Sequence, residues 1–530
     1  MRKLFFLIMA GVTALAICPR MHAQATGSFS GIVTDKSGAI VSGATVTATS
    51  QATGLARTGK TDDAGHYLIP LLPVGTYTVR VDSTGFQSTE SKDLTLQVDE
   101  ARELNFTLAP ASVSTTVTVA GQAVAVETSN PSLGQVITSQ EVSQLPLNGR
   151  NFVQLATLTA GATAETNPNS FFTGGADSEV AARGSFSLSV GGSRPNSTDW
   201  ILDGVDNNEL TAGGIGIFSS IDDIQEFKVL TYTYSAEYGT RAGPTVLVTT
   251  KSGTNDFHGS LYEFFRNTAL NAKSYFATSA QKFNLNQFGG SIGGPIRKNK
   301  TFFFVDGEQK YQREGIVFTG LLPSLAMRSG DFSADAFGNP VSGFAIINPN
   351  MTGASTNPAV YPNVYFQCNG SGQPLPANPD GSQPQGTPCN KIPSNLFNNI
   401  GQAMMNLYPT PNANNAAAGY NYLNVPVREL DQTRFDTRVD HNFSAADSLF
   451  ARFSYDQAFS YVPGGSSGFA EASAFGSNQR IINHARNAAI GETHVFSASM
   501  VNQATFGYNR IFDYISSQGT GSCASATIVP

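Results

Sequence analysis

Alternating apolar and polar residues, interrupted by short turn-forming runs, fill the chain from residue 29 to residue 108. The run GTYTVRV is typical: one face carries Tyr77, Val79 and Val81, and the other carries Thr76, Thr78 and Arg80. Because successive side chains of a strand point to opposite faces, this is the pattern of a half-buried strand. Turn residues recur about every 8–12 positions, so the region is predicted to form a small β-sandwich.

Beyond Asn255 the chain alternates between amphipathic strands and long loops rich in Asn, Pro, Gly and Ser. In RFDTRVDHNF one face carries Arg434, Asp436, Arg438 and Asp440, and the other carries Phe435, Thr437 and Val439. In LFARFSYD the residues Leu449, Ala451, Phe453 and Tyr455 oppose Phe450, Arg452, Ser454 and Asp456. Strands of about ten residues with charges opposite aromatic side chains suit a membrane barrel with a polar lumen. A soluble sandwich produces similar alternation, so the pattern alone leaves both open.

The segment from residue 322 to residue 426 is too long for a loop of a compact domain, and it favours an extracellular excursion. Between Phe257 and Phe512 we expect about seven to nine strands. A barrel that encloses a whole domain has about 22 strands, so the expected number is too small for such a barrel. The chain stops at SCASATIVP without a terminal strand that ends in an aromatic residue. We therefore expect it to be truncated at its C-terminal end, relative to a complete barrel.

The first 25 residues have the pattern of a secretory signal peptide. Arg2 and Lys3 precede an apolar run over residues 4–18, and Ala23 and Ala25 supply the small residues of a cleavage site. No later stretch approaches about 18 unbroken apolar residues, the length that a membrane helix needs. Entry into a membrane would therefore require a closed barrel, which leaves no backbone group unsatisfied in lipid.

Composition supports extended β structure and argues against some classes of partner. Only 13% of the residues are charged, and the chain has 52 Gly, 36 Phe and 17 Tyr, which strands and turns favour. The net charge of −7 provides no basic surface, so nucleic acid is not an expected partner. Cys368 and Cys389 bracket a segment rich in Pro, Gly and Asn, and an exported protein could pair them. Cys523 is left over.

Motifs that suggest enzymatic chemistry lack the required context. Residues 54–61, GLARTGKT, match a phosphate-binding loop, but a turn follows where a helix must begin. Residues 464–468, GGSSG, match a nucleophile elbow but follow Pro463 and precede a loop-like run. No histidine or cysteine has zinc spacing. Asp203, Asp206 and Glu209 could offer oxygens to calcium, but an Asp/Asn-rich turn is favoured. We expect no catalytic residues, no cofactor and no metal.

Two regions carry a resemblance to known families. The segment GIVTDKSGAIVSGATVTATS, with TDDAGHYLIPLLPVGTYTVRVDSTGF after it, resembles a carboxypeptidase-regulatory-like domain, a prealbumin-like sandwich with a carbohydrate-binding-like fold. LPLNGRNF, LDGVDNN, EYG and TKSGTNDFHG follow in the order seen in TonB-dependent outer-membrane receptors of the Oar-like group. The resemblance implies a mainly β protein: a sandwich, an α+β plug domain, and the first part of a large antiparallel transmembrane β-barrel.

The expected organisation is a signal peptide at 1–25, the sandwich at 26–110, a linker at 111–120, the plug at 121–253 and a partial barrel at 254–530. The linker contains a possible TonB box, made of Thr115, Thr116, Val117, Thr118, Val119 and Ala120. In the plug, NFVQLATL is expected to form a short helix that packs by Phe152, Leu155 and Leu158. Four plug arginines could line the barrel: Arg150, Arg183, Arg194 and Arg241.

The resemblance implies a receptor that imports an extracellular ligand, with no enzymatic activity. Its partners would be a TonB-type energy-transducing complex, outer-membrane lipid and a ligand that the sandwich suggests is a carbohydrate. The barrel would be monomeric, in a Gram-negative outer membrane, with the N-terminal domain in the periplasm. Siderophores, cobalamin, oligosaccharides and peptides all stay open as ligands. The alternative is a cell-surface carbohydrate-binding or adhesion protein without active transport.

Overall fold

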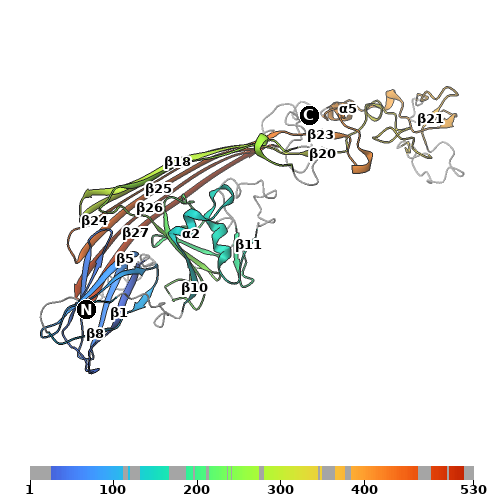
Figure 1. Ribbon diagram of the computed structural model, residues 1–530. Coiled ribbons are helices and arrows are strands. Elements are labelled where there is room, and N and C mark those ends of the chain that lie inside the picture. The colour runs from blue at the N-terminus through green and yellow to red at the C-terminus, as the bar shows by residue number, and fades with distance from the viewer. Residues whose placement is uncertain are drawn as a thin grey trace, which may run out of the picture.

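The computed structural model contains three β-rich parts, shown in Figure 1. It describes residues 26–111, 117–119, 132–165, 187–194, 197–210, 214–235, 237–239, 241–273, 280–343, 346–348, 365–376, 384–406, 408–463, 479–497 and 500–517. The predicted signal peptide, Arg183, Cys523 and residues 464–468 lie outside these ranges. We call the parts the N-terminal domain (β1–β8), the central domain (β10–β16) and the large sheet. The mainly β fold class is confirmed.

The N-terminal domain is a sandwich of two sheets. Its strands are β1 (Thr26–Asp35), β2 (Thr45–Ser50), β3 (Ala56–Lys60), β4 (His66–Pro73), β5 (Gly75–Asp82), β6 (Thr89–Leu96), β7 (Ala101–Glu103) and β8 (Phe106–Leu108). One sheet has the order β4-β1-β7, with β8 also on β1, and the other has the order β3-β2-β5-β6-β9. The last strand, β9 (Val117–Val119), follows the domain and pairs with β6 in parallel.

The apolar side chains between the two sheets are those that strand alternation predicts. Tyr77, Val79 and Val81 are buried, and Phe29 of the opposite sheet meets Tyr77 edge-on at 5.7 Å between ring centroids. The phosphate-loop match at residues 54–61 is coincidental, because Ala56–Lys60 forms strand β3 where that motif needs a helix.

The central domain combines a five-stranded sheet with short helices. Its elements are β10 (Leu133–Ile137), α2 (Ser139–Gln144), the 3₁₀ helices η1 (Asn148–Arg150) and η2 (Phe152–Leu158), β11 (Ala162–Glu165), β12 (Ser187–Val190), β13 (Asp199–Leu202), β14 (Val205–Asp206), β15 (Ile224–Tyr232) and β16 (Thr245–Thr250). The main sheet has the order β10-β15-β16-β13-β14, and β11 pairs with β12 separately. Helix α2 begins with a capping box between Thr138 and Glu141, which satisfies two backbone donors.

The expected short helix in NFVQLATL is present as η2. Phe152 and Leu155 are buried, and Phe152 lies 5.0 Å from Phe218 and 5.4 Å from Phe227 between ring centroids. The prediction for Leu158 is wrong, because this side chain is 50% exposed. Leu158 is the last residue of η2, and the buried stripe runs through Val153 and Ala156 instead.

The large sheet contains seven antiparallel strands in sequential order, within the range that the sequence predicts. They are β17 (His258–Asn267), β18 (Phe283–Arg297), β19 (Thr301–Gly315), β24 (Val427–Asn442), β25 (Asp447–Val462), β26 (Gln479–Ser497) and β27 (Met500–Ser517). The expected length of about ten residues is an underestimate, since β18 has 15 residues and β26 has 19. Strands of this length would be long enough to extend beyond the hydrocarbon layer of a membrane.

The connections at the two ends of the large sheet differ in length. Only three residues join β18 to β19, four join β24 to β25, and two join β26 to β27. At the opposite end, residues 316–426 join β19 to β24. The N-terminal domain lies at the short-turn end and the central domain lies beside the large sheet, whereas the described parts of residues 316–426 project from the other end (Figure 1).

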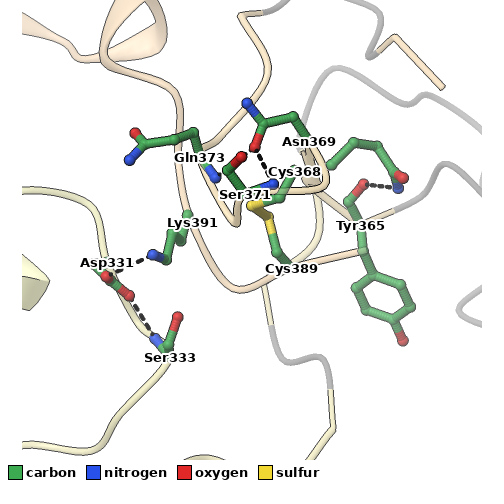
Figure 2. Close-up of a disulfide and its surroundings, with 10 residues drawn as sticks. Asp331, Ser333, Tyr365, Cys368, Asn369, Ser371, Gln373, Cys389 and Lys391 are labelled. Atoms are coloured by element: carbon green, nitrogen blue, oxygen red, sulfur yellow. Dashed lines mark hydrogen bonds and ion pairs between the residues drawn. A yellow bond between two sulfur atoms is a disulfide. The ribbon is translucent and has the colours of Figure 1, made fainter. Parts of the chain in front are cut away.

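The projecting segment contains short elements braced by one disulfide. They are β20 (Phe318–Gly320), α4 (Leu325–Arg328), β21 (Gln367–Cys368), β22 (Thr387–Pro388), η5 (Ser394–Leu396), α5 (Asn399–Asn406), η6 (Ala416–Ala418) and β23 (Tyr422–Asn424). Strands β21 and β22 pair beside the bond between Cys368 and Cys389, whose Cα atoms are 5.8 Å apart (Figure 2). Nearby, Lys391 forms an ion pair with Asp331 at 3.2 Å. In the described residues, no helix has the length and apolarity needed to cross a membrane.

Candidate functional site

The candidate site is the contact between the central domain and the inner face of the large sheet. Strands β19, β24 and β25 turn charged side chains inward, and these are buried: Asp306, Glu308, Arg434, Asp436, Arg438, Arg452 and Asp456. The intervening residues face outward, and Phe435 and Phe453 are each 41% exposed. The face assignments made from the sequence are therefore confirmed. A charged inner face opposite an apolar outer face is the arrangement of a barrel wall with a polar lumen.

Arg150 connects the central domain to this charged face. Gly149 and Arg150 both have a left-handed backbone, with φ of 64° and 54°, so the NGR run makes a sharp turn before η2. The Arg150 guanidinium forms ion pairs with Asp222 of the central domain and, at 3.2 Å, with Glu308 of β19. It also lies 4.1 Å from the ring centroid of Tyr262 on β17. One side chain thus contacts two strands of the large sheet.

Glu308 holds two arginines from opposite sides of the contact. Besides Arg150, it binds Arg434 of β24 at 3.1 Å, and its other oxygen accepts the hydroxyl proton of Tyr262 at 3.0 Å. Arg434 in turn lies 4.9 Å from the ring centroid of Phe218, a core residue of the central domain. The carboxylate is therefore surrounded by positive charge, as a buried anion requires.

Asp203 is the second junction, in the turn between β13 and β14. Its backbone is left-handed, with φ of 47°. The carboxylate accepts hydrogen bonds from the Thr250 amide at 3.0 Å and the Thr250 hydroxyl at 2.7 Å. It also forms ion pairs with Arg438 at 3.2 Å and Arg452 at 2.8 Å, on β24 and β25. Asp203 thus fixes the end of the central sheet and ties it to the wall.

Apolar packing also crosses this contact, because Ala485 of β26 belongs to the core cluster of the central domain and Ile511 of β27 packs against that cluster. Val205 of β14 clusters with Phe450 and Ala489 of the large sheet. Gly507 of β27 lets β14 approach closely, because a Cβ atom there would lie 2.3 Å from a methyl carbon of Val205. Charged hydrogen bonds add to this apolar packing. When the two parts separate, water can replace the partners of these hydrogen bonds, whereas the gain from apolar burial is lost.

Burial shifts the pKa of ionisable groups on the central domain and just after it. Burial, reinforced by the nearby Asp436 and Asp306 carboxylates, raises the pKa of Asp223 well above its usual range. Burial also lowers the pKa of Lys251, against the opposing effect of Asp222. These groups are sensitive to how closely the central domain sits on the wall.

The other arginines expected at this contact have different surroundings. Arg194 is exposed, and Arg241 donates to the backbone carbonyl of Glu209 at 3.3 Å, within the central domain. The alternative calcium role of Asp203, Asp206 and Glu209 is not supported, because Asp203 is engaged by arginines and Asp206 accepts from the Asn208 amide at 2.9 Å. The sequence reasoning missed Asp203 and Glu308 as ion-pair partners. The inward-facing Arg434 and Arg438 could have indicated these partners, because a buried guanidinium needs an anion beside it.

Metal-ligating side chains meet at one place in the part of the chain that the structure describes. Asp447, Glu492 and His494 bring one ligand atom each within 4.8 Å of one another. The His494 ring nitrogen is already hydrogen-bonded to the Asp447 carboxylate. Two of the three groups are therefore engaged with each other at the short-turn end of β25 and β26.

The possible TonB box falls partly within the described residues. Val117, Thr118 and Val119 form β9, with Val117 opposite Thr89 and Val119 opposite Ser91 in the register of β6. Thr115, Thr116 and Ala120 lie outside the described residues. The backbone of the segment can thus form a strand, which is the conformation that strand addition to a partner requires.

Two family descriptions match the chain. "Outer membrane beta barrel domain" matches residues 249–529, and "Carboxypeptidase regulatory-like domain" matches residues 28–109. The TonB-dependent transporter Oar of Myxococcus xanthus is 26% identical over 276 residues, an alignment that covers 51% of this chain and 25% of that protein. The chain thus spans about a quarter of the length of this curated relative.

Solved structures of outer-membrane proteins are also similar. The outer membrane transporter YddB from Escherichia coli has a TM-score of 0.40 and 10% identity, over 72% of this chain and 39% of that chain. The siderophore receptor PirA from Acinetobacter baumannii has a TM-score of 0.34 and 13% identity, over 70% of this chain and 43% of that chain.

Proposed function

We propose, on the premise that this chain belongs to the outer membrane β-barrel domain family, that it acts as a receptor that imports an extracellular ligand. The chain is a protein of the Gram-negative outer membrane. In this proposal the large sheet is part of a barrel wall and the central domain is the plug. Import is then a movement of the plug, driven through a TonB-type complex, with no covalent chemistry.

The observation that carries the proposal is the ion-paired contact between the central domain and the charged inner face. Apolar packing alone is sufficient to hold a domain permanently in place. Here Arg150, Asp203 and Glu308 add charged contacts to it. Water can solvate these groups once they separate, so the charged part of the contact can open and close reversibly.

The asymmetry of the connections supports an orientation. Outer-membrane barrels have short periplasmic turns and longer extracellular loops. By that rule the short turns and the N-terminal domain face the periplasm, and residues 316–426 face outward. The disulfide between Cys368 and Cys389 then lies in the oxidising exterior, where such bonds persist. Ligand would be gathered by this outer segment.

Residues 115–120 would be the segment that the TonB-type partner binds, by adding a strand. They lie between the N-terminal and central domains, so a pull on them acts on both domains through the chain. The alternative is a surface protein that uses residues 316–426 and the N-terminal domain for carbohydrate binding or adhesion. The size and bracing of the outer segment favour binding, but they do not by themselves require import.

Accumulation by living cells tests the proposal. Cells that carry the gene would be offered labelled ferric siderophores, cobalamin, oligosaccharides and peptides, with and without a protonophore. We expect accumulation of one class, its loss with the protonophore, and its loss on deletion of residues 115–120, while surface binding persists. Surface binding of a probe without energy-dependent accumulation would overturn import and support adhesion.

A matched variant separates loss of the segment from loss of its backbone pairing. Val119→Pro removes one backbone N–H, and Val119→Thr keeps it with a side chain of similar size. We expect the proline variant to lose accumulation and the threonine variant to keep it. Equal accumulation by both variants would contradict strand addition at this segment.

A further inference from the structure

The N-terminal domain contacts the central domain through the turn between β6 and β7. Val98 of this turn is fully buried and clusters with Ile201, Leu230 and Leu247 of the central sheet. Its backbone N–H donates to the carboxylate of Glu226 on β15. Next to it, the Lys228 ammonium donates to the Asp99 carbonyl at 2.9 Å and pairs with the Asp99 carboxylate at 3.2 Å. This contact is buried, apolar at its centre and charge-paired at its edge.

The same domain also contacts the short-turn end of the large sheet, which we call the rim (Asn255, Asn299 and Ser448). The Asn255 amide donates to the carbonyl of the exposed Ala52 at 2.9 Å. The Arg57 guanidinium donates to the Ser448 hydroxyl at 3.0 Å. These two bonds are polar and water can replace them, although Arg57 is itself buried, whereas Val98 adds buried apolar surface to the other contact.

Open space lies beside both contacts. A cavity of about 560 Å³ lies between the N-terminal and central domains, and one of about 500 Å³ lies where both meet the large sheet. The N-terminal domain therefore rests on its neighbours at separate points rather than across a continuous packed surface.

Strand β9 lies on the same part of the N-terminal domain. Its three residues pair with Thr89–Ser91 of β6, and β6 leads directly into the turn that carries Val98. The chain then continues from β9 to β10 of the central domain. A pull on β9 is therefore transmitted to the N-terminal domain through β6 and to the central domain through the chain.

We propose that the N-terminal domain is a clasp that ties the central domain to the rim, and that a pull on Val117–Val119 opens the rim contact first. The Val98 contact then stays closed, and the N-terminal and central domains leave the rim as one body. This inference rests on the proposed function, in which residues 115–120 are pulled from the periplasm.

Single-molecule pulling on the full gene product in lipid nanodiscs tests the order of opening. A handle attached by click chemistry to an azide-bearing residue introduced at position 118 supplies the force, so no partner or ligand is needed and the attachment does not compete with the maleimide. Cys523→Ser removes a further thiol that could react. A short bismaleimide joins Ala52→Cys to Asn255→Cys in one variant and Asp99→Cys to Lys228→Cys in the other. Each pair is joined before its protein receives the handle.

We expect the first rupture of the uncrosslinked protein to disappear when the rim pair is joined. Joining the Asp99 and Lys228 positions should leave that rupture unchanged. Loss of the first rupture in the second variant alone, or in neither variant, would overturn the proposal. The instrument supplies the force, so the pulling experiment does not depend on import. If the import proposal is wrong, only the accumulation assay shows it, and if the clasp proposal is wrong, the pulling experiment shows it.

Substitutions at Val98 and Leu68 supply a further control. Val98→Asp places a charge in the buried contact, whereas Leu68→Asp places the same charge at a half-exposed position of β4. We expect Val98→Asp to separate the two domains under load, which adds a second rupture that Leu68→Asp does not show. A single, unchanged rupture in Val98→Asp would contradict the assignment of Val98 as the stronger contact.

Discussion

Two buried regions of the molecule are held by different kinds of interaction. One is the apolar core of the N-terminal domain, and the other is the charged contact between the central domain and the large sheet. In the first, Phe29, Tyr77 and Val79 pack between two sheets with almost no exposed surface. In the second, Asp203 and Arg438 face each other with the other charged groups of the wall around them. Under the proposed function, the apolar core is the part that stays closed and the ion-paired contact is the part that opens.

Physical chemistry explains the choice of residues. Apolar burial is favourable in proportion to the area removed from water, and the whole gain is lost when the surfaces part. A buried ion pair adds little net stability, because desolvation offsets the attraction, yet removing one partner is strongly destabilising. The sandwich therefore resists opening, whereas the ion-paired contact is specific in geometry and reversible when both partners are rehydrated.

The largest expected effect is in the apolar core. Phe29→Ala removes a fully buried ring that packs on Tyr77, so it should destabilise the N-terminal domain by about 3–5 kcal/mol. Hydrogen exchange of β1 and β5 in the full protein measures this loss, while the amides of β24 should keep their protection. Leu68→Ala, at a half-exposed position, should change stability by less than about 0.5 kcal/mol. Equal effects of the two would contradict the assigned core.

The ion-paired contact should respond strongly to loss of one charge. Asp203→Asn leaves Arg438 and Arg452 facing a neutral group, so it should loosen the central domain by roughly 3 kcal/mol. The measurement is the hydrogen-exchange rate of β13 and β16. The triple change Asp203→Asn with Arg438→Met and Arg452→Met should recover part of the protection, because the amide oxygen can still accept from Thr250 and neither guanidinium is left facing a neutral group. It should impair accumulation, because the added apolar surface resists separation. Recovered protection with full accumulation would argue against reversibility as the reason for the charges.

The contact made by Val98 should depend on pH through Glu226. Burial raises the pKa of Glu226 from its ordinary 4.5 to about 7, against the opposing Val98 N–H bond. The folded protein therefore binds more protons than the unfolded protein between these values, so stability falls as pH rises through that window. Glu226→Gln should match wild type below pH about 4.5 and exceed it by roughly 2–3 kcal/mol above pH about 7. Denaturant midpoints at both pH values check this, and a pH-independent difference would refute it.

The smallest expected effect concerns Arg150. Arg150→Lys keeps the charge but loses the planar group that reaches Asp222 and Glu308 together, which should weaken the contact by roughly 1–2 kcal/mol. Arg150→Met should cost more, because Asp222 then loses its arginine. Hydrogen exchange of η2 measures both variants. A lysine variant as weak as the methionine variant would show that geometry, rather than charge, dominates at this position.

Much of the architecture could be predicted from local pattern. The period-two alternation identified Tyr77, Val79 and Val81 as core and assigned Arg434, Asp436 and Arg438 to the inner face. The error at Leu158 arose because periodicity does not locate where a core ends. The strands were underestimated because the pattern shows which face is buried, while strand length depends on hydrogen bonding to neighbours that are distant in sequence.

The sequence by itself determined which residues are apolar, which are charged, and which alternate, because these properties belong to each side chain and its neighbours along the chain. Only the tertiary structure decided that Asp203 pairs with Arg438 and that Glu226 meets Val98. Those partners are 235 and 128 residues apart. Their choice follows from strand register and from how two domains dock, and no local pattern encodes either.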